Sequence, residues 1–353
     1  MQPQLKWDLG TAYDFFISLD VLHDPATYGV RGVWAAGMRS RLPGAEREFL
    51  DEVMGMMNLP IAWVYTLPPP KDAATALRTL EKVPLAERLL TLARYSRIPA
   101  EALPILRELA ARSAWQPEER ETLRRILAAT ERVRTAQRPG ALDKLLKWCT
   151  RAEEFGERYL RALRAYYEVF FAEEERRIYP ALQDALEQAQ ELAGRLSVPQ
   201  LIEELSQGLW FAETLKVSEL ALAPSYWSAP LIFFEQLDER RALLLFGGRP
   251  ADAALIPGEV VPEQLLRALK ALSDPTRLKI MRYLARESLT PTQLSHRLRL
   301  RAPTVVHHLQ ALRAAGLVQV MIAEGKERTY ALRVGSVRAA CEALQNFLRG
   351  EGG

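Results

Sequence analysis

Through the first 209 residues, apolar side chains recur mostly at steps of three and four positions. This spacing places them on one face of an α-helix. The longest interruption lies at residues 67–72, because three successive prolines cannot continue a helix. The pattern predicts helices at residues 11–23, 31–41, 45–57 and 198–209, and an almost wholly helical stretch at 73–196 that contains a long segment from 141 to 178 and another from 180 to 196.

The pattern changes after residue 217. Three short apolar runs, at residues 219–224, 231–234 and 242–247, are separated by turn residues and are typical of strands. The connections between them are too short to hold a crossover helix, which favours antiparallel pairing. We therefore expect a small antiparallel β segment at about residues 217–248.

Glycine and proline are concentrated between residues 247 and 258, and this stretch is the best linker in the chain. It predicts a mostly helical domain at residues 1–260, which includes the β segment, and a second domain at residues 261–349. The expected fold class is mainly α.

The second domain begins with three helix signals. Residues 263–272 carry leucines at helical spacing. Asp274 is a typical N-cap, and Pro275 follows it at the first helical position. Thr290 and Gln293 form a capping box that opens a third helix.

The fourth helix of this domain is predicted at residues 302–315. Val305, Leu309 and Leu312 form its core stripe, and Gly316 is the expected C-terminal stop. Strands are predicted at residues 317–322 and 328–332, with a polar tip between them. Helices followed by a β-hairpin in this order predict a winged helix-turn-helix.

Charge is distributed unevenly between the two predicted domains. Residues 262–353 carry 15 Lys and Arg against 7 Asp and Glu, whereas residues 1–261 carry 32 basic and 37 acidic side chains. The net charges are therefore +8 and −5. A small basic unit beside a larger acidic one is typical of a nucleic-acid-binding module on a separate body.

Three segments of the basic domain carry motifs in a familiar order. They read LKALSDPTRLKI at 269–280, LTPTQL at 289–294 and PTVVHHLQALRAAGLV at 303–318. Together they resemble the ArsR-type family of bacterial transcription regulators, over residues 262–349 or about a quarter of the chain. The resemblance implies a dimeric regulator of double-stranded DNA. It places a recognition helix at about 302–315 in the major groove and a wing at about 318–332 on the backbone.

Helix geometry and the resemblance together indicate which side chains face DNA. Gln310 has the groups to pair with adenine, His307 can donate to a purine acceptor or a phosphate, and Val306 can touch a thymine methyl. His308 lies nearer the core stripe and is more typical of a packed histidine than of a base reader. The predicted DNA-binding residues are Arg301, Ala302, Pro303, Thr304, Val306, His307, Gln310, Lys326 and Arg328.

Two positions depart from the family pattern. Family members often carry serine where Arg301 and Val306 stand here. The first change removes a helix N-cap, although an arginine can hold a phosphate or pair with guanine. The second removes a hydroxyl from the groove face. We therefore expect an operator that differs from the usual one of the family.

The last helix, predicted at residues 336–348, carries Val337, Cys341, Leu344 and Leu348 in one stripe. This stripe needs a partner surface, which is either a second copy of the chain or the core of its own domain. Because the resemblance implies a homodimer, two recognition helices would contact half-sites about 34 Å apart.

Metal, cofactor and catalytic sites are not expected. The third helix of the domain has no cysteine, and the last helix has no histidine or aspartate, so the ligands of the family's metal sensors are missing. The chain has no Gly-x-Ser-x-Gly, no phosphate-binding glycine loop and no His-Glu-x-x-His. No apolar run approaches the roughly 18 residues of a membrane span, and no secretion signal opens the chain, so a cytoplasmic protein without a membrane role is expected.

The predicted function is a non-enzymatic, sequence-specific repressor whose N-terminal domain senses a small-molecule effector. Aromatic residues at 166, 167, 170 and 171 suit either a core or the wall of an apolar ligand pocket, and a core is the more typical role. Two alternatives come from other classes. The winged helix can serve as a protein-interaction module, or the N-terminal domain can hold an enzymatic activity without a recognisable motif.

Overall fold

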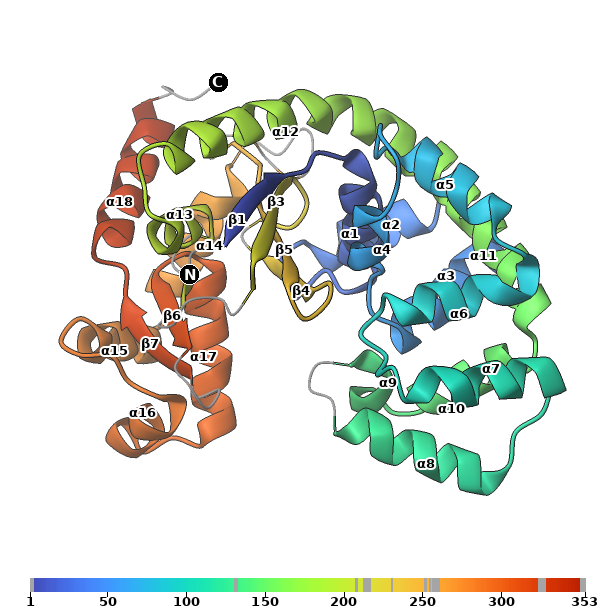
Figure 1. Cartoon of the computed structure of the whole chain (residues 1–353). Coiled ribbons are helices and arrows are strands. Elements are labelled where there is room, and N and C mark those ends of the chain that lie inside the picture. The colour runs from blue at the N-terminus through green and yellow to red at the C-terminus, as the bar shows by residue number, and fades with distance from the viewer. Residues whose placement is uncertain are drawn as a thin grey trace. The chain divides into compact units, whose positions relative to one another are not determined.

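A computed structural model of the chain describes residues 3–129, 133–206, 209–211, 217–229, 231–250, 253, 255, 261–322 and 328–349. The chain divides into two units, one made of residues 8–180 and the other of residues 1–7 and 181–353. The first is called the helical unit below, and the second the mixed unit. Helices predominate in both, as the sequence predicted (Figure 1).

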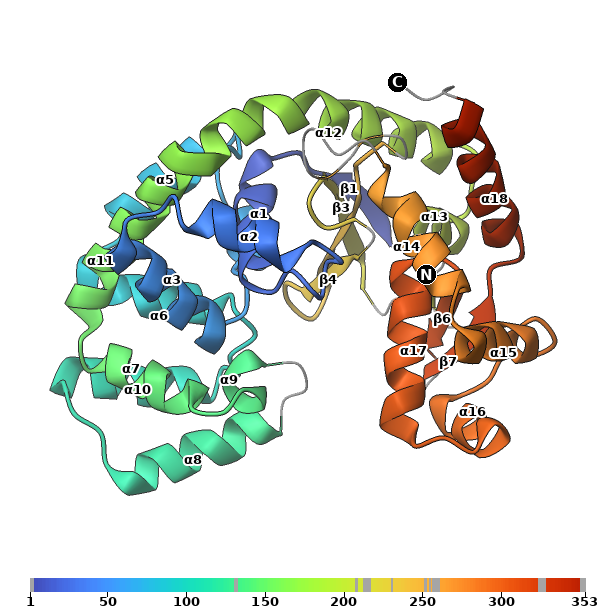
Figure 2. The same cartoon turned by 180° about the vertical axis from the view of Figure 1, so that it is seen from behind.

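The helical unit is built from short helices that connect through tight turns (Figures 1 and 2). Its helices are α1 (Thr11–His23), α2 (Gly32–Arg39), α3 (Gly44–Met56), α4 (Ile61–Tyr65), α5 (Ala73–Lys82), η1 (Leu85–Glu87), α6 (Arg88–Arg94), α7 (Ala102–Arg112), α8 (Pro117–Ala128), α9 (Arg134–Gln137), α10 (Ala141–Cys149), α11 (Ala152–Tyr166), η2 (Tyr167–Phe171) and the first half of α12 (Ala172–Ala193).

Helix α1 runs through the core of this unit, and every residue from Thr11 to Leu22 is buried. Phe15 lies 5.2 Å from Phe171 between ring centroids, at an angle of 62°. Tyr166 is also fully buried, and its hydroxyl lies 2.8 Å from that of Ser18. Edge-to-face aromatic contacts of this kind add to the energy of apolar burial. Tyr166 and Phe171, at least, therefore belong to a packed core.

Buried polar groups of α1 are paired with other elements. Asp20 accepts two hydrogen bonds from the guanidinium of Arg134, at 2.6 and 2.7 Å, and one from the hydroxyl of Tyr28 at 2.8 Å. These bonds offset the cost of burying the carboxylate. The interactions tie the last turn of α1 to α9.

The mixed unit combines a small sheet with the C-terminal helices. Its elements are β1 (Gln4–Trp7), the second half of α12, α13 (Val198–Leu205), β2 (Leu209–Phe211), β3 (Glu219–Ser225), β4 (Phe233–Gln236), β5 (Arg241–Gly247), α14 (Glu263–Leu272), α15 (Pro275–Leu284), α16 (Pro291–Leu298), α17 (Ala302–Ala314), β6 (Val318–Ile322), β7 (Arg328–Leu332) and α18 (Val334–Arg349).

Strand order in the first sheet is β1-β3-β5-β4, and the sheet is mixed. Strand β4 pairs antiparallel with β5, as predicted, and Phe234 lies opposite Leu244. Strands β3 and β5 are parallel, with Leu220 opposite Ala242. The prediction of an antiparallel β segment is therefore wrong for this pair. Strand β1 extends the sheet in parallel with β3 and was not predicted.

The parallel pair arises because the chain passes from β3 to β4, two positions away in the sheet, and leaves the position beside β3 for β5. Neighbouring strands lie about 4.8 Å apart, so the connection from Ser225 to Phe233 has ample reach to pass two spacings. Strand β4 then forms the edge, and a tight turn returns β5 between it and β3. Short connections therefore predicted the antiparallel direction correctly only for strands that follow one another in the sequence, such as β4 and β5.

Helix boundaries differ from the prediction at three places. The segment predicted at 141–178 is broken between Cys149 and Ala152, where α10 ends and α11 begins. Pro180 lies inside α12 instead of starting a helix. Helix α13 ends at Leu205, and Leu209 begins β2. Patterns of apolar spacing locate helices better than they locate such breaks, because a leucine suits both a helix and a buried strand.

The predicted domain boundary at residues 260 and 261 lies inside the mixed unit. Strand β2 pairs in parallel with β6, and Leu209 lies opposite Val320. Segments on both sides of residue 260 therefore share one sheet, of order β2-β6-β7. The division into residues 1–260 and 261–349 stays a prediction.

The contacts of Asp51 with His23 and Arg39 predict a pH-dependent stability. One carboxylate oxygen of Asp51 lies 3.1 Å from His23 Nε2 and 3.2 Å from Arg39 Nη1. The contact with His23 first, and then the ion pair with Arg39, hold the pKa of Asp51 below its usual value against the opposing effect of burial. The lowered pKa contributes to the free energy of unfolding. This contribution is fully present above the pKa that the carboxyl has in the unfolded chain, and it is lost as the pH falls through the lower pKa of the folded protein.

We expect Asp51→Asn to lower the thermal unfolding midpoint at pH 7. The difference from the unmodified protein should shrink to nothing as the pH is taken down through the carboxyl range. Asp184→Asn, at an exposed position of α12, makes the same charge change and is the control. A difference that stays constant down to pH 3 would contradict the assigned interaction.

Candidate nucleic-acid interface

The predicted caps of the winged helix-turn-helix are confirmed. Oδ1 of Asp274 accepts from the backbone N–H groups of Thr276 and Arg277, at 2.8 and 3.0 Å. These bonds lower the pKa of the Asp274 carboxyl. Thr290 Oγ1 accepts from the N–H of Gln293 at 3.2 Å, and the amide oxygen of Gln293 accepts from the N–H of Thr290 at 2.9 Å. Helices α15 and α16 therefore start at fixed positions.

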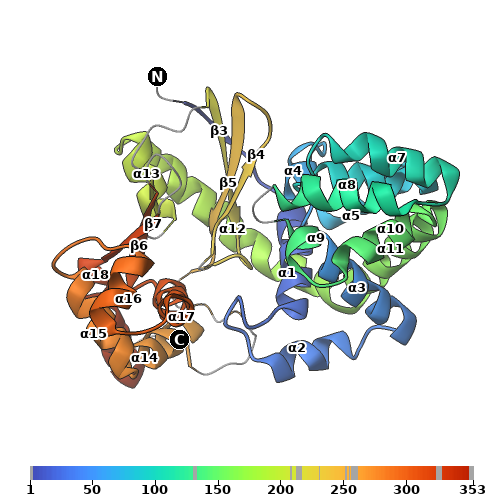
Figure 3. The same cartoon turned by 90° about the horizontal axis from the view of Figure 1, so that it is seen from below.

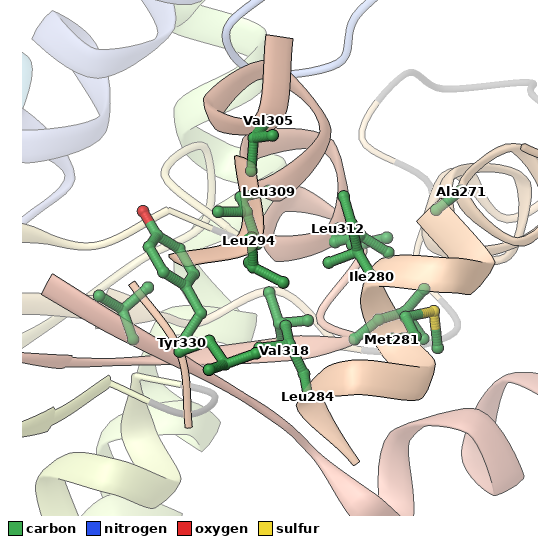
Figure 4. Packing of buried hydrophobic residues seen from close by; sticks show 14 residues of the cluster. Ala271, Ile280, Met281, Leu284, Leu294, Val305, Leu309, Leu312, Val318 and Tyr330 are labelled. Carbon is green, nitrogen blue, oxygen red and sulfur yellow. The ribbon is translucent and has the colours of Figure 1, made fainter. Parts of the chain in front are cut away.

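Helix α17 is held by a buried stripe. Val305, Leu309 and Leu312 are fully buried, as predicted. They pack in one cluster with residues of α15, α16 and the β-hairpin, among them Ile280 and Leu294 (Figure 4). Burial of a leucine side chain contributes about 1.5–3 kcal/mol relative to exposure. The stripe therefore fixes which face of α17 remains outside.

The turn between α16 and α17 is tight. Arg299 has a φ of 55°, in the left-handed region, and caps α16. The N–H of Leu300 returns to the carbonyl of Ser295 at 3.1 Å. A non-glycine residue in this region carries some strain, which the surrounding packing must hold. Its side chain is exposed. Figure 3 shows α16 beside α17, the two helices that this turn joins.

Pro303, His307 and Gln310 lie on the side of α17 opposite the buried stripe, and the other predicted residues lie at the start of the helix or at the edge of that side. Arg301 is the N-cap, and its side chain makes no capping hydrogen bond. Val306 is half-buried at the edge of this face. The exposed members of the predicted set on this helix are Arg301, Ala302, Pro303, Thr304, His307 and Gln310.

The wing is described only in part. Strands β6 and β7 pair antiparallel, and Ile322 lies opposite Arg328. Arg328 is exposed at the start of β7. Lys326, the other predicted wing contact, lies outside the described residues. An antiparallel bridge between Leu289 and Tyr330 places the segment before α16 beside β7.

His308 faces the protein more than the solvent. Its side chain is 15% exposed, and Nδ1 lies 3.9 Å from Oδ2 of Asp274. The contact joins α17 to the cap of α15, which the sequence did not predict. This position agrees with the interpretation of His308 as a packed histidine and leaves His307 on the outer face.

Positive charge gathers beside the N-terminus of α17. Arg297 forms an ion pair with Glu287 at 2.7 Å. Among the described residues, neither Arg299 nor Arg301 forms an ion pair, and both are exposed. Their charges are thus directed to solvent, where a phosphate backbone would be met.

The residues of the α18 stripe differ in burial. Val337 packs against the C-terminal core. Leu344 is half-buried, Cys341 is exposed, and the side chain of Leu348 is 74% exposed. The end of the stripe therefore has no partner within the part of the chain that the structure describes.

Metal-binding groups are not assembled within the described segments, where no cluster of three or more His, Cys, Asp or Glu residues could hold an ion. Cys149 is buried, and burial raises the pKa of its thiol to about 12. Cys341 is exposed on α18. Within the same segments, the helices are too short or too polar to cross a bilayer.

Comparison with known families identifies the segment that contains these features. Residues 274–320 match the model of the bacterial regulatory proteins of the arsR family. The chain carries an ArsR-family helix-turn-helix. This segment identifies it as a DNA-binding transcription regulator, and the predicted resemblance is confirmed over residues 274–320. No curated protein and no solved structure matches the chain.

Two features next to the ArsR-family segment were missed by sequence reasoning. Strand β2 joins the sheet of the wing, although its first residue, Leu209, was predicted to end a helix and the next two were assigned to no element. A cavity between α14 and α18 was also not foreseen. Neither has a local sequence signal, because each depends on which distant segments meet.

Loss of the cap at Asp274 gives a test of the local structure. We expect Asp274→Ala to lower the free energy of unfolding by about 1 kcal/mol, because two backbone N–H groups lose their acceptor. Asp274→Asn keeps an accepting oxygen and should retain most of that stability. Urea denaturation of both variants measures the difference, and an equal loss in the two would contradict the capping role.

Proposed function

We propose that the chain is a sequence-specific repressor that binds double-stranded DNA as a homodimer. The observation that carries this proposal is the outward face of α17. A stripe of three buried side chains holds the helix, His307 and Gln310 extend from its other side, and Arg301 is exposed at its N-cap. An α-helix fits a major groove about 12 Å wide, and its N-terminal part usually meets the base edges.

Each exposed side chain suits a particular contact. Gln310 can form a bidentate pair with adenine, and His307 can donate to a purine N7 or to a phosphate. The half-buried Val306 offers a methyl group to thymine. Arg301 replaces a capping serine of the family and is free to hold a phosphate or to pair with guanine. This set supports an operator different from the usual one of the family.

Backbone contacts would come from positive charge around the helix. Arg299 and Arg301 lie at its N-terminal end, and Arg328 lies at the start of β7 in the wing. The net charge of +8 over residues 262–353 supports a nucleic-acid partner over a protein partner. The alternative role as a protein-interaction module is an outcome of the DNA-binding test.

The exposed end of α18 supports the homodimer. Leu348 is 74% exposed and continues the stripe of Cys341 and Leu344. An apolar stripe of this kind is stabilised when a second copy covers it. Two-fold pairing would place two α17 helices in successive major grooves, and the operator would be a pseudo-palindrome.

We further propose that the helical unit has a sensing role rather than a catalytic one. The sequence carries none of the Gly-x-Ser-x-Gly, phosphate-loop or His-Glu-x-x-His motifs considered above. A small-molecule effector acts on DNA affinity only if it binds the two conformations of the regulator unequally. We infer a cytoplasmic, non-enzymatic regulator that needs no cofactor, and repression follows if the dimer covers a promoter until the effector arrives.

Fluorescence anisotropy with DNA fragments from upstream of the protein's own gene tests the base-reading face. His307→Ala and Gln310→Ala should each reduce the preference for the specific fragment by about 1–3 kcal/mol, with nonspecific affinity unchanged. Gln183→Ala, at an exposed position of α12, is the matched control. If the unmodified protein binds no DNA even at low salt, the DNA-binding proposal is wrong and the interaction-module role replaces it.

The wing contact has a different signature. Arg328→Ala should weaken binding to all fragments about equally, and should reduce the slope of log affinity against log salt by about one. The reason is that one phosphate contact releases about one counterion. A loss confined to one DNA sequence would show that Arg328 contacts a base instead.

The dimer is tested by Leu348→Asp. A charge on the exposed stripe should convert the dimer to a monomer in sedimentation velocity and lower DNA affinity, because the two half-sites are then bound separately. Leu278→Asp, at a 47% exposed position of α15, makes the same substitution away from α18. An unmodified protein that is already monomeric would contradict the proposal.

A further inference from the structure

A cavity of about 480 Å³ lies between α14 and α18, in the mixed unit. Figure 1 shows the two helices beside each other. Small residues of α18 leave the space open, among them Ala339, Ala340 and Ala343, and Leu265 and Ala268 line the side of α14. The volume lies within the range of about 300–1,000 Å³ typical of sites for small organic molecules.

The cavity and the proposed dimer stripe lie on different faces of α18. At roughly 100° per residue, the three alanines and Phe347 point in a direction about 120° away from that of Cys341, Leu344 and Leu348. A partner seated on the stripe does not by that contact fill the cavity. The two surfaces can therefore have different occupants.

One positively charged side chain lines the cavity. Arg333 is the only charged residue among the lining residues that the structure describes. Its Nη1 donates to the carbonyl of Gly316 at a long 3.4 Å, and no ion pair with a described carboxylate neutralises it. Gly335 and Ser336, in the first turn of α18, also line the space, so the positive end of that helix opens into it.

We propose that this cavity binds an organic anion with an apolar body, and that Arg333 pairs with the anionic group. The expected effect of the ligand on DNA affinity rests on the proposed function. The binding of the anion to the cavity does not. A guanidinium bonds more strongly to an anionic group, where both partners are charged, than to an uncharged carbonyl. The apolar lining accepts the rest of the ligand.

The position of Arg333 connects the cavity to the DNA-binding elements. The residue follows β7 of the wing directly, and its carbonyl partner, Gly316, ends α17 with a φ of 69°. Ala315 and Gly316 themselves line the cavity. An anion that draws the guanidinium away from Gly316 changes a contact between the end of α17 and the base of the wing. A ligand here would thus favour one arrangement of the two over the other.

Two fluorescent probes that differ only in charge test the binding. 8-Anilinonaphthalene-1-sulfonate is an apolar anion, and N-phenyl-1-naphthylamine is the same body without the sulfonate. With the full chain, we expect the anion to bind about tenfold more tightly, which corresponds to about 1.4 kcal/mol. Arg333→Met should abolish this preference, whereas Arg338→Met, at an exposed position of α18, should retain it. Equal affinities of the two probes for the unmodified chain would overturn the assignment to an anion.

The location is tested by filling the cavity. Ala340→Phe should abolish binding of both probes, and circular dichroism checks that the variant is folded. Ala26→Phe, at an exposed turn of the helical unit, is the control. Undiminished probe binding by a folded Ala340→Phe would falsify the site. If this variant instead converts a dimer to a monomer in sedimentation velocity, a second copy of the chain occupies the cavity, and the ligand proposal is overturned.

The consequence for DNA is measured separately. The sulfonate probe should raise the dissociation constant of the specific fragment several-fold for the unmodified protein, and should leave that of Arg333→Met unchanged. Probe binding without any DNA binding would show that the proposed function fails while the anion site stands. Normal DNA binding without probe binding would show the reverse.

Discussion

The burial of one side of α17 determines what the rest of that helix can do. Val305, Leu309 and Leu312 enter a core to which α14, α15, α16 and the β-hairpin all contribute. Rotating the helix would expose these side chains and bury His307 or Gln310 without partners, and both changes are costly. The packing of the core therefore determines which side chains of α17 are exposed. Substitutions on the exposed face therefore need not alter the fold.

The surrounding elements restrict α17 at both of its ends. At its start, the tight turn at Arg299 and the capped helix α16 set where the helix begins. Along its length, His308 meets the carboxylate that also caps α15. At its end, Gly316 accepts from Arg333, which belongs to the segment between β7 and α18. The helix is thus held through contacts that reach every other part of the winged helix-turn-helix.

Local signals were sufficient for most of this domain. Asp274, Thr290 and Gly316 each act on their own neighbours, so their roles follow from the sequence, and the core stripe follows from helical spacing. The same reasoning could not find β1 or β2, because a strand of three or four residues is defined by the segment it pairs with. The parallel arrangement of β3 and β5 was missed for the same reason. His308 and the cavity beside α18 depend on distances between helices, which no pattern along the chain encodes.

The register of the first strand has a consequence for how the chain is made. Gln4 lies beside Glu219, so β1 leaves the ribosome long before the strand that it pairs with. The whole helical unit, residues 8–180, is synthesised in between and has its own core to collapse upon. Domains generally fold as units during synthesis, and pairings distant in sequence form slowly. The sheet of the mixed unit is therefore completed late, after the helical unit has been made and has begun to fold.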